Sequence, residues 1–206
     1  MDDLCRSSII SKAIQVKGWF EKIELGLLID CVEQVALGNK HYSDPLNIVE
    51  IGSYHGRSTI AMGLAVVALH IDAVLYAVDP HEGLRSGRYD RIYSEGKSYN
   101  DFIRNVKYYG LESMIKCVKS KSTESRLNIP ISLILIDALH LYENVREDFL
   151  HFENNLYKGS LIAFHDYRDE FPGVLRFVNY LLDTKEPLSY VIVDQAYSLI
   201  VLKKVS

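Results

Sequence analysis

The segment Asn47–Ile60 constrains the fold more than any other part of the chain. An apolar run ends at Glu50-Ile51, a turn with two glycines follows, and a helical pattern begins at Arg57. In an open α/β sheet, a turn of this kind lies at the carboxyl end of a strand and holds a small ligand. The segment therefore predicts an α/β protein with a ligand site beside this turn.

Strands and helices are predicted to alternate through most of the chain. Apolar runs indicate strands at 46–51, 74–78, 115–118, 131–136 and 160–164, with helices at 58–69, 99–109, 143–154 and 173–182. This alternation is typical of a parallel sheet covered on both faces. The runs 188–193 and 197–202 are joined by three residues, too few for a parallel crossover, so they predict an antiparallel hairpin. We expect a Rossmann-like sandwich with a seven-stranded, mostly parallel sheet.

One domain over residues 1–206 is expected, because this length suits a single large core. Apolar residues repeat at helical spacing over about residues 9–38, which predicts an N-terminal helical extension within residues 1–40 that packs on the sheet. The alternative is a lid in which Trp19 or Phe20 contacts substrate. Residues 81–97 combine arginines, tyrosines and glycines and are predicted to form a substrate lid, with a solvated loop as the alternative.

Composition excludes several classes of protein. A net charge of -4 argues against a nucleic-acid partner held by bulk electrostatics. The apolar runs are too short for a membrane span, and the acidic start of the chain does not resemble a signal peptide. Three widely spaced cysteines fit neither a metal motif nor a disulfide framework, which indicates a reducing compartment, the cytoplasm. The sequence leaves open whether the chain forms a homo-oligomer.

Residues after the first three predicted strands are candidates for cofactor binding. The glycines allow close backbone approach, and the N–H groups at the helix start favour a carboxylate. Asp79 ends the second strand, where an acid can accept hydrogen bonds from both ribose hydroxyls. A nicotinamide cofactor would use the same acid, although Tyr54 stands where a dinucleotide motif would have glycine. The candidates are Glu50, Gly52, Ser53, Tyr54, Gly56, Ser58, Asp79, Pro80, Ser120 and Ser122.

Four segments resemble class I S-adenosylmethionine-dependent methyltransferases, and the macrocin O-methyltransferase-like branch in particular. They are Val49–Thr59, Ala77–Pro80, Leu135–Tyr142 and Gly159–Tyr167. The last two resemble the Asp-Gly-Asp-His-x-Tyr and His-Asp-Tyr signatures of that branch. The resemblance implies that S-adenosylmethionine is the cofactor and that the acceptor is a hydroxyl of a small molecule, such as a sugar or a natural-product glycoside. Leu139 stands where the branch usually has a second acid, so the role of that acid is unsupported here.

Acids and histidines follow the fourth and fifth predicted strands, whose ends would meet in the cleft if the strands are neighbours. Resemblance to metal-dependent O-methyltransferases places a divalent ion, Mg²⁺ or Mn²⁺, at Asp137 and Asp166, with His165 as a further ligand. His140 is predicted to be the general base, since an ordinary pKa of about 6.5 suits proton acceptance. Asp137 would also act in catalysis, through the metal that lowers the pKa of the acceptor. The alternatives are structural: turn caps for the two acids and a core position for His165.

Two other functions compete with methyl transfer. A nicotinamide-dependent oxidoreductase is disfavoured by Tyr54 and by the C-terminal hairpin. A non-catalytic nucleoside-binding module of the same fold stays open because Leu139 replaces an acid of the resembled branch.

Overall fold

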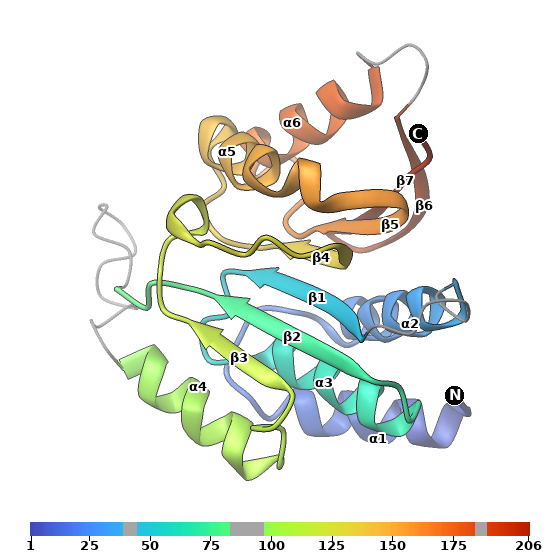
Figure 1. Cartoon of the computed structure of the whole chain (residues 1–206), viewed down its shortest axis with the longest axis vertical. Helices are drawn as coiled ribbons and strands as arrows, with labels where there is room; N and C mark the ends of the chain where they lie inside the picture. The colour runs from blue at the N-terminus through green and yellow to red at the C-terminus, as the bar shows by residue number, and fades with distance from the viewer. Residues whose placement is uncertain (39–44, 83–96, 184–188) are drawn as a thin grey trace.

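The structure, a computed structural model, describes residues 1–38, 45–82, 97–183 and 189–206 (Figure 1). Within these residues, seven strands form one sheet in the order β3-β2-β1-β4-β5-β7-β6. Neighbours from β3 to β5 pair in parallel, whereas β7 pairs antiparallel with both β5 and β6. This confirms the predicted seven-stranded sheet and its antiparallel C-terminal pair. The strands are β1 (Leu46–Ile51), β2 (Ala73–Val78), β3 (Ile115–Val118), β4 (Ile131–Ile136), β5 (Leu156–Phe164), β6 (Tyr190–Ala196) and β7 (Leu199–Lys204).

Helices cover both faces of the sheet and bury two apolar clusters. Alternate strand residues face opposite clusters, so Leu133 and Leu135 pack on one side and Ile134 and Ile136 on the other. One cluster lies under α1, α2, α3 and α4, and the other lies under α5 and α6. The helices are α1 (Asp3–Ala13), α2 (Lys22–Gly38), α3 (Arg57–Ala68), α4 (Lys97–Tyr108), α5 (Tyr142–Phe152) and α6 (Pro172–Asp183).

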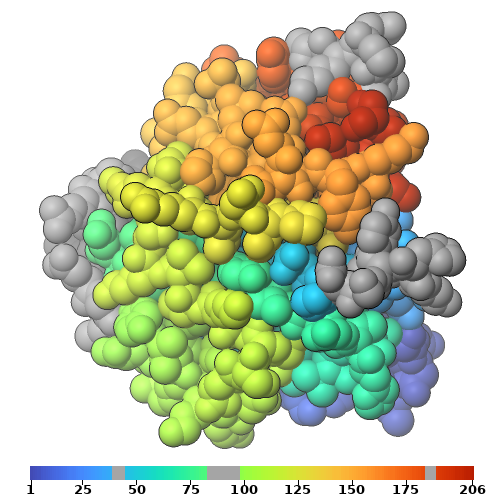
Figure 2. All heavy atoms as spheres, in the orientation of Figure 1, coloured from blue at the N-terminus to red at the C-terminus, as the bar shows by residue number. Residues whose placement is uncertain are grey.

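Side chains fill the space between the sheet and the helices on its two faces. In the space-filling view, the yellow residues around β4 contact both the green side of the molecule and the orange side (Figure 2). All six residues of β4 are buried, as expected for a central parallel strand. Among the helices that the structure describes, none combines the length and the apolar character that a membrane crossing needs.

The N-terminal region differs from the single helix predicted over residues 9–38, because α1 and α2 are separated by residues 14–21. We call residues 14–21 the N-terminal strap. The guanidinium of Arg57 donates to the carbonyl oxygens of Val16 and Phe20 at 2.7 and 2.9 Å, which replaces helical hydrogen bonds. A Cβ on Gly18 would lie 2.9 Å from the Cβ of Arg57, so glycine permits this close approach. Val16 and Phe20 in the strap are buried, so the apolar residues keep helical spacing across the break. For this reason the periodicity of the sequence does not reveal the break.

The turn of the C-terminal hairpin differs from the sequence prediction, and most of the predicted substrate lid cannot be compared with it. The hairpin turn is Tyr197-Ser198 rather than 194–196, and Tyr197 has φ 53°, as a two-residue hairpin turn requires. Most of the predicted substrate lid, residues 83–96, lies outside the described residues. At its start, His81 is buried, and its N–H donates to Oδ1 of Asp79 at 2.7 Å.

Candidate functional site

A cavity of about 880 Å³ opens at the carboxyl ends of β1, β2, β4 and β5. Its size lies in the usual range for a cofactor or small-molecule site. Most of the candidate residues named from the sequence line it, whereas Glu50, Gly56 and Ser120 do not. Those that do are Gly52, Ser53, Tyr54, Ser58, Asp79, Pro80, Ser122, Asp137, His140, His165 and Asp166.

The turn between β1 and α3 brings two strand ends into close contact. Gly52 has φ 91°, and its N–H donates to the carbonyl oxygen of Val78 at 2.9 Å. A Cβ on Gly52 would lie 2.1 Å from the carbonyl oxygen of Asp137, a separation that no side chain tolerates. Gly56 has φ 93° and is the N-cap residue directly before α3. The glycines thus allow this turn to pass directly over the end of β4 and leave backbone groups facing the cavity.

Glu50 lies behind this turn and is fully buried. The hydroxyls of Ser58 and Thr59 donate to its two carboxylate oxygens. Burial raises the pKa of Glu50 to about 7, although these hydrogen bonds act in the opposite direction. Glu50 therefore ties the end of β1 to the first turn of α3. Its predicted contact with a cofactor stays a prediction.

Asp79 orients the two loops that border the cofactor end of the cavity. Its Oδ2 accepts from the N–H of Tyr54 at 2.8 Å, and its Oδ1 accepts from the N–H of His81 at 2.7 Å. A carboxylate offers about four acceptor positions, so each oxygen can accept a further hydrogen bond from a ligand. The buried hydroxyl of Ser53, which also borders the cavity, makes no hydrogen bond to any described residue. These unused polar groups suit a ligand with several hydroxyls and polar ends.

Asp148 borders the cavity next to η2 (Ser122–Glu124) and was not a candidate from the sequence. It accepts a hydrogen bond from the buried hydroxyl of Ser122, and burial raises its pKa to about 6. Ser120 lies outside the cavity, and its hydroxyl donates to the carbonyl oxygen of Lys121. A signal for Asp148 was present, because it shares helical spacing with the buried residues Val145 and Phe152.

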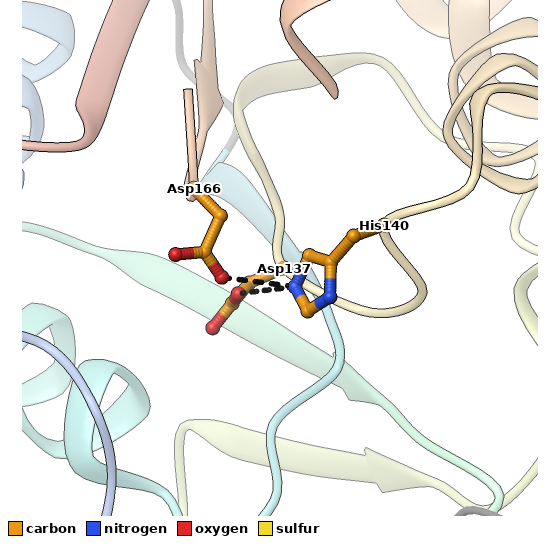
Figure 3. Close-up of side chains that lie close together, drawn as sticks. All are labelled: Asp137, His140 and Asp166. Carbon is orange, nitrogen blue, oxygen red and sulfur yellow. Dashed lines mark ion pairs between the residues drawn. The ribbon is translucent and has the colours of Figure 1, made fainter. Parts of the chain in front are cut away.

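Three side chains from the ends of β4 and β5 meet at the other end of the cavity (Figure 3). Nε2 of His140 lies 2.9 Å from Oδ2 of Asp166 and 4.0 Å from Oδ1 of Asp137. One donor atom from each of the three lies within 4.8 Å of the others, an arrangement that could hold a metal ion. Burial would lower the pKa of His140, but the carboxylates of Asp137 and Asp166 outweigh it and raise the pKa to about 9.

His165 lies beside this cluster and is held on both sides of its ring. Its Nδ1 lies 3.0 Å from Oδ1 of Asp137 and 3.4 Å from Oδ2 of Asp166, and its Nε2 lies 3.4 Å from Oε2 of Glu24. The ring stacks on Phe20 with centroids 4.1 Å apart. Burial opposes a charge on this ring, yet the surrounding carboxylates raise its pKa to about 12. The group of three donors contains His140 and not His165, although Nδ1 of His165 also lies near both acids, so the predicted metal role of His165 stays a prediction.

Aromatic side chains border the mouth of the cavity. Trp19, which is half exposed, stacks on Tyr54 with centroids 4.7 Å apart. Phe171 lies 4.5 Å from the ring of His140, and Arg168 donates to the hydroxyl of Tyr197 at 2.7 Å. These contacts place the N-terminal strap beside the cofactor turn. The alternative that Trp19 or Phe20 contacts substrate stays a prediction.

Comparison with known families identifies the family to which this fold belongs. Residues 49–167, more than half of the chain, match the family model described as a methyltransferase domain. The chain belongs to this methyltransferase family. The match spans the cofactor turn, Asp79, and the cluster of Asp137, His140 and Asp166, so it includes the residues on both sides of the cavity.

Solved structures share the fold across the whole chain. The O-methyltransferase NovP is 15% identical, with a TM-score of 0.78 over 99% of this chain and 98% of that one. The methyltransferase PaMTH1 of Podospora anserina, solved with S-adenosylhomocysteine, is 12% identical, with a TM-score of 0.67 over 100% of this chain and 89% of that one. At these identities the likeness shows the fold alone, and it confirms the predicted class I methyltransferase sandwich.

A curated relative is the protein y4gI of Sinorhizobium fredii, which is 25% identical over 126 residues. The matched region covers 61% of this chain but only 14% of that protein. This methyltransferase therefore spans a small part of the length of its curated relative.

Proposed function

We propose that this methyltransferase transfers the methyl group of S-adenosylmethionine to a hydroxyl of a small molecule, with a divalent cation beside the acceptor. The observation that carries the proposal is one cavity bordered at one end by the glycine turn with Asp79 and at the other by Asp137, His140 and Asp166. Methyl transfer needs its two reactants in line, and a shared cavity supplies that placement.

The cofactor end offers groups for each part of the nucleoside. The backbone beside Gly52 and the buried hydroxyl of Ser53 would receive the amino-acid end, and the free acceptor positions of Asp79 would receive the ribose hydroxyls. Ser122 and Asp148 border the region where the base would lie. These residues orient the cofactor, which supplies an electrophilic methyl group on a sulfonium sulfur.

The acceptor end has the chemistry of a metal site. Asp137, His140 and Asp166 would hold the cation, and two carboxylates with one imidazole suit Mn²⁺ better than Mg²⁺, which prefers oxygen ligands. Such a cation would lower the pKa of an acceptor hydroxyl beside it, so that the proton of the hydroxyl passes to water and the oxygen takes the methyl group from the sulfonium. The proposal gives His140 this ligand role instead of the predicted role as general base, because its Nε2 lies inside the donor group, 2.9 Å from Oδ2 of Asp166 and 4.0 Å from Oδ1 of Asp137. As a ligand the imidazole would be neutral.

A sugar or a natural-product glycoside is the proposed acceptor. Supporting it, Trp19, Tyr54 and Phe171 line the cavity with aromatic rings, and Leu139, 41% exposed, adds an apolar contact. We further propose that the protein acts in the cytoplasm on free small molecules, without a nucleic-acid or membrane partner. A homo-oligomer is compatible with this proposal. The three cysteines are free, which is consistent with a reducing compartment.

A binding and turnover experiment tests the proposal. Calorimetric titration with S-adenosylmethionine, S-adenosylhomocysteine and NAD should detect the first two ligands and not the third. Transfer of a labelled methyl group is then measured with hydroxyl acceptors, with and without Mn²⁺, and after EDTA. Binding without turnover across a broad set of acceptors would favour the non-catalytic module, and turnover that EDTA leaves unchanged would remove the cation from the proposal.

A further inference from the structure

A buried carboxylate links the N-terminal region to the acceptor end of the cavity. Glu24, on α2, has no exposed surface. Its Oε2 accepts from the N–H of Glu21 at 2.7 Å, and its Oε1 accepts from the N–H and the hydroxyl of Ser198 at 3.0 and 2.6 Å. Burying an ionised carboxylate costs several kcal/mol unless it is well paired, so these contacts indicate a specific role for Glu24.

The remaining contact of Glu24 is with His165, 141 positions along the chain. Oε2 of Glu24 lies 3.4 Å from Nε2 of His165, whose opposite nitrogen faces Asp137 and Asp166. Phe20 stacks on the face of the ring. The imidazole is therefore held at both nitrogens and on one face, and it cannot turn without breaking several contacts.

Asp137 and Asp166 come from the ends of two different strands, so an additional contact is needed to hold their carboxylates in a fixed relation. Nδ1 of His165 is within 3.4 Å of an oxygen of each. An N–H on this nitrogen would hold both oxygens in place. The same two oxygens face Nε2 of His140, and each keeps a further lone pair for a cation. Partners behind metal ligands act in this way, and their loss typically weakens metal affinity by roughly 10–100-fold.

We propose that Glu24 is a positioning residue, which acts through His165 to hold the carboxylates of Asp137 and Asp166 in the arrangement that binds the divalent cation. This inference rests on the proposed metal role of that cluster. It gives His165 a place behind the ligands rather than among them. It also makes the acceptor end depend on α2 and on Ser198 in the hairpin turn, two regions outside the matched residues 49–167.

The test compares Glu24→Gln with Glu33→Gln in the full chain. Both replace an acid on α2 with its amide, but the carboxylate of Glu33 pairs with the N-terminal amine, away from the cavity. Binding of Mn²⁺ is followed by electron paramagnetic resonance. We expect Glu24→Gln to weaken Mn²⁺ affinity by about 10–100-fold while the Kd for S-adenosylmethionine changes less than twofold. Glu33→Gln should change neither.

Carboxylate carbon signals of Asp137 and Asp166, recorded by NMR in metal-free protein, supply the second measurement. Glu24→Gln should move both signals and those of the His165 ring, and Glu33→Gln should move none. If Glu24→Gln does not fold, Glu24→Asp, which keeps the charge on a shorter side chain, takes its place. If wild-type protein binds no Mn²⁺, the metal part of the proposed function fails, and the NMR signals alone decide the positioning role. Unchanged signals in the Glu24 variant would overturn it, as would unchanged Mn²⁺ affinity in a protein that binds the ion.

Discussion

Nε of Arg57 donates a hydrogen bond to the carbonyl oxygen of Val16 at 2.7 Å, although 41 positions separate the two residues. The contact joins the first residue of α3 to the N-terminal strap. The same guanidinium also bonds the carbonyl oxygen of Phe20, so one side chain fixes the backbone on both sides of Gly18 and Trp19. The cofactor turn and the segment beside it are thus held as one unit.

Arg57→Lys should loosen the strap, because an ammonium cannot reproduce the planar set of donors of a guanidinium. Trp19 is the single tryptophan of the chain and stacks on Tyr54, so its fluorescence reports this region directly. We expect a red-shifted emission maximum and stronger iodide quenching in the variant. Arg146→Lys, at an exposed position on α5, is the control and should leave the emission unchanged. Equal spectra for wild type and Arg57→Lys would contradict the anchoring role.

Gly52→Ala should destabilise the protein by about 2–5 kcal/mol, the sum of a left-handed backbone penalty and overpacking. The added methyl group would meet the carbonyl oxygen of Asp137 at 2.1 Å. Gly110→Ala is the matched control, since Gly110 also has positive φ but has no atom within 4 Å of its Cβ position. It should cost only about 1–2 kcal/mol. Urea unfolding of both variants measures the difference, and similar losses would show that the contact with Asp137 is unimportant.

Asp79→Asn should weaken binding of S-adenosylmethionine by about 10–100-fold, the effect expected when hydrogen bonds to a charged acceptor are lost. The amide would also disturb the loop, because Asp79 accepts from the N–H groups of both Tyr54 and His81. Asp72→Asn, an exposed change just before the same strand, is the control. Calorimetric titration gives both affinities. If Asp79→Asn retains wild-type affinity, the ribose contact is wrong.

Glu50 should make the stability of the protein depend on pH in a way that Glu50→Gln removes. Its pKa rises from an ordinary 4.5 to about 7 on folding, because burial disfavours the charged form. The contribution of Glu50 to stability is therefore full below pH 4.5 and is lost as the pH rises through 7. The free energy of unfolding of wild type relative to Glu50→Gln should fall by about 3 kcal/mol across this interval.

Urea unfolding at several pH values measures this dependence. The exposed Glu112 supplies the control, because Glu112→Gln should run parallel to wild type at every pH. A constant difference between wild type and Glu50→Gln would show that Glu50 keeps an ordinary pKa.

Local sequence patterns predicted most of the sheet, since each central strand is a short apolar run whose burial on both faces matches its composition. They also predicted that Gly52, Asp79, Asp137 and Asp166 lie at one cavity, because the topology brings the carboxyl ends of parallel strands to one edge of the sheet. The break between α1 and α2 was missed, since it depends on Arg57, which is distant in the sequence.

Buried acids on helices were missed for a related reason. Glu24 shares helical spacing with the buried residues Leu28 and Cys31, so an acid at that place in an apolar stripe was a usable signal. Its partners, His165 and Ser198, lie far along the chain, and no pattern in the sequence pairs them with α2. Which of His140 and His165 faces the two acids as a possible metal ligand likewise depends on ring orientation, which spacing does not specify.

The position of β7 between β5 and β6 has a consequence for biosynthesis. Leu161 to Phe164 of β5 pair with β7, and Ser198 in the turn before it bonds Glu24. A ribosome that has translated α6 has already delivered every metal-site candidate, yet the partner strand of β5 is still missing. The nascent polypeptide therefore cannot complete this pocket until β7 has left the exit tunnel, since Tyr197 and Ser198 line the cavity.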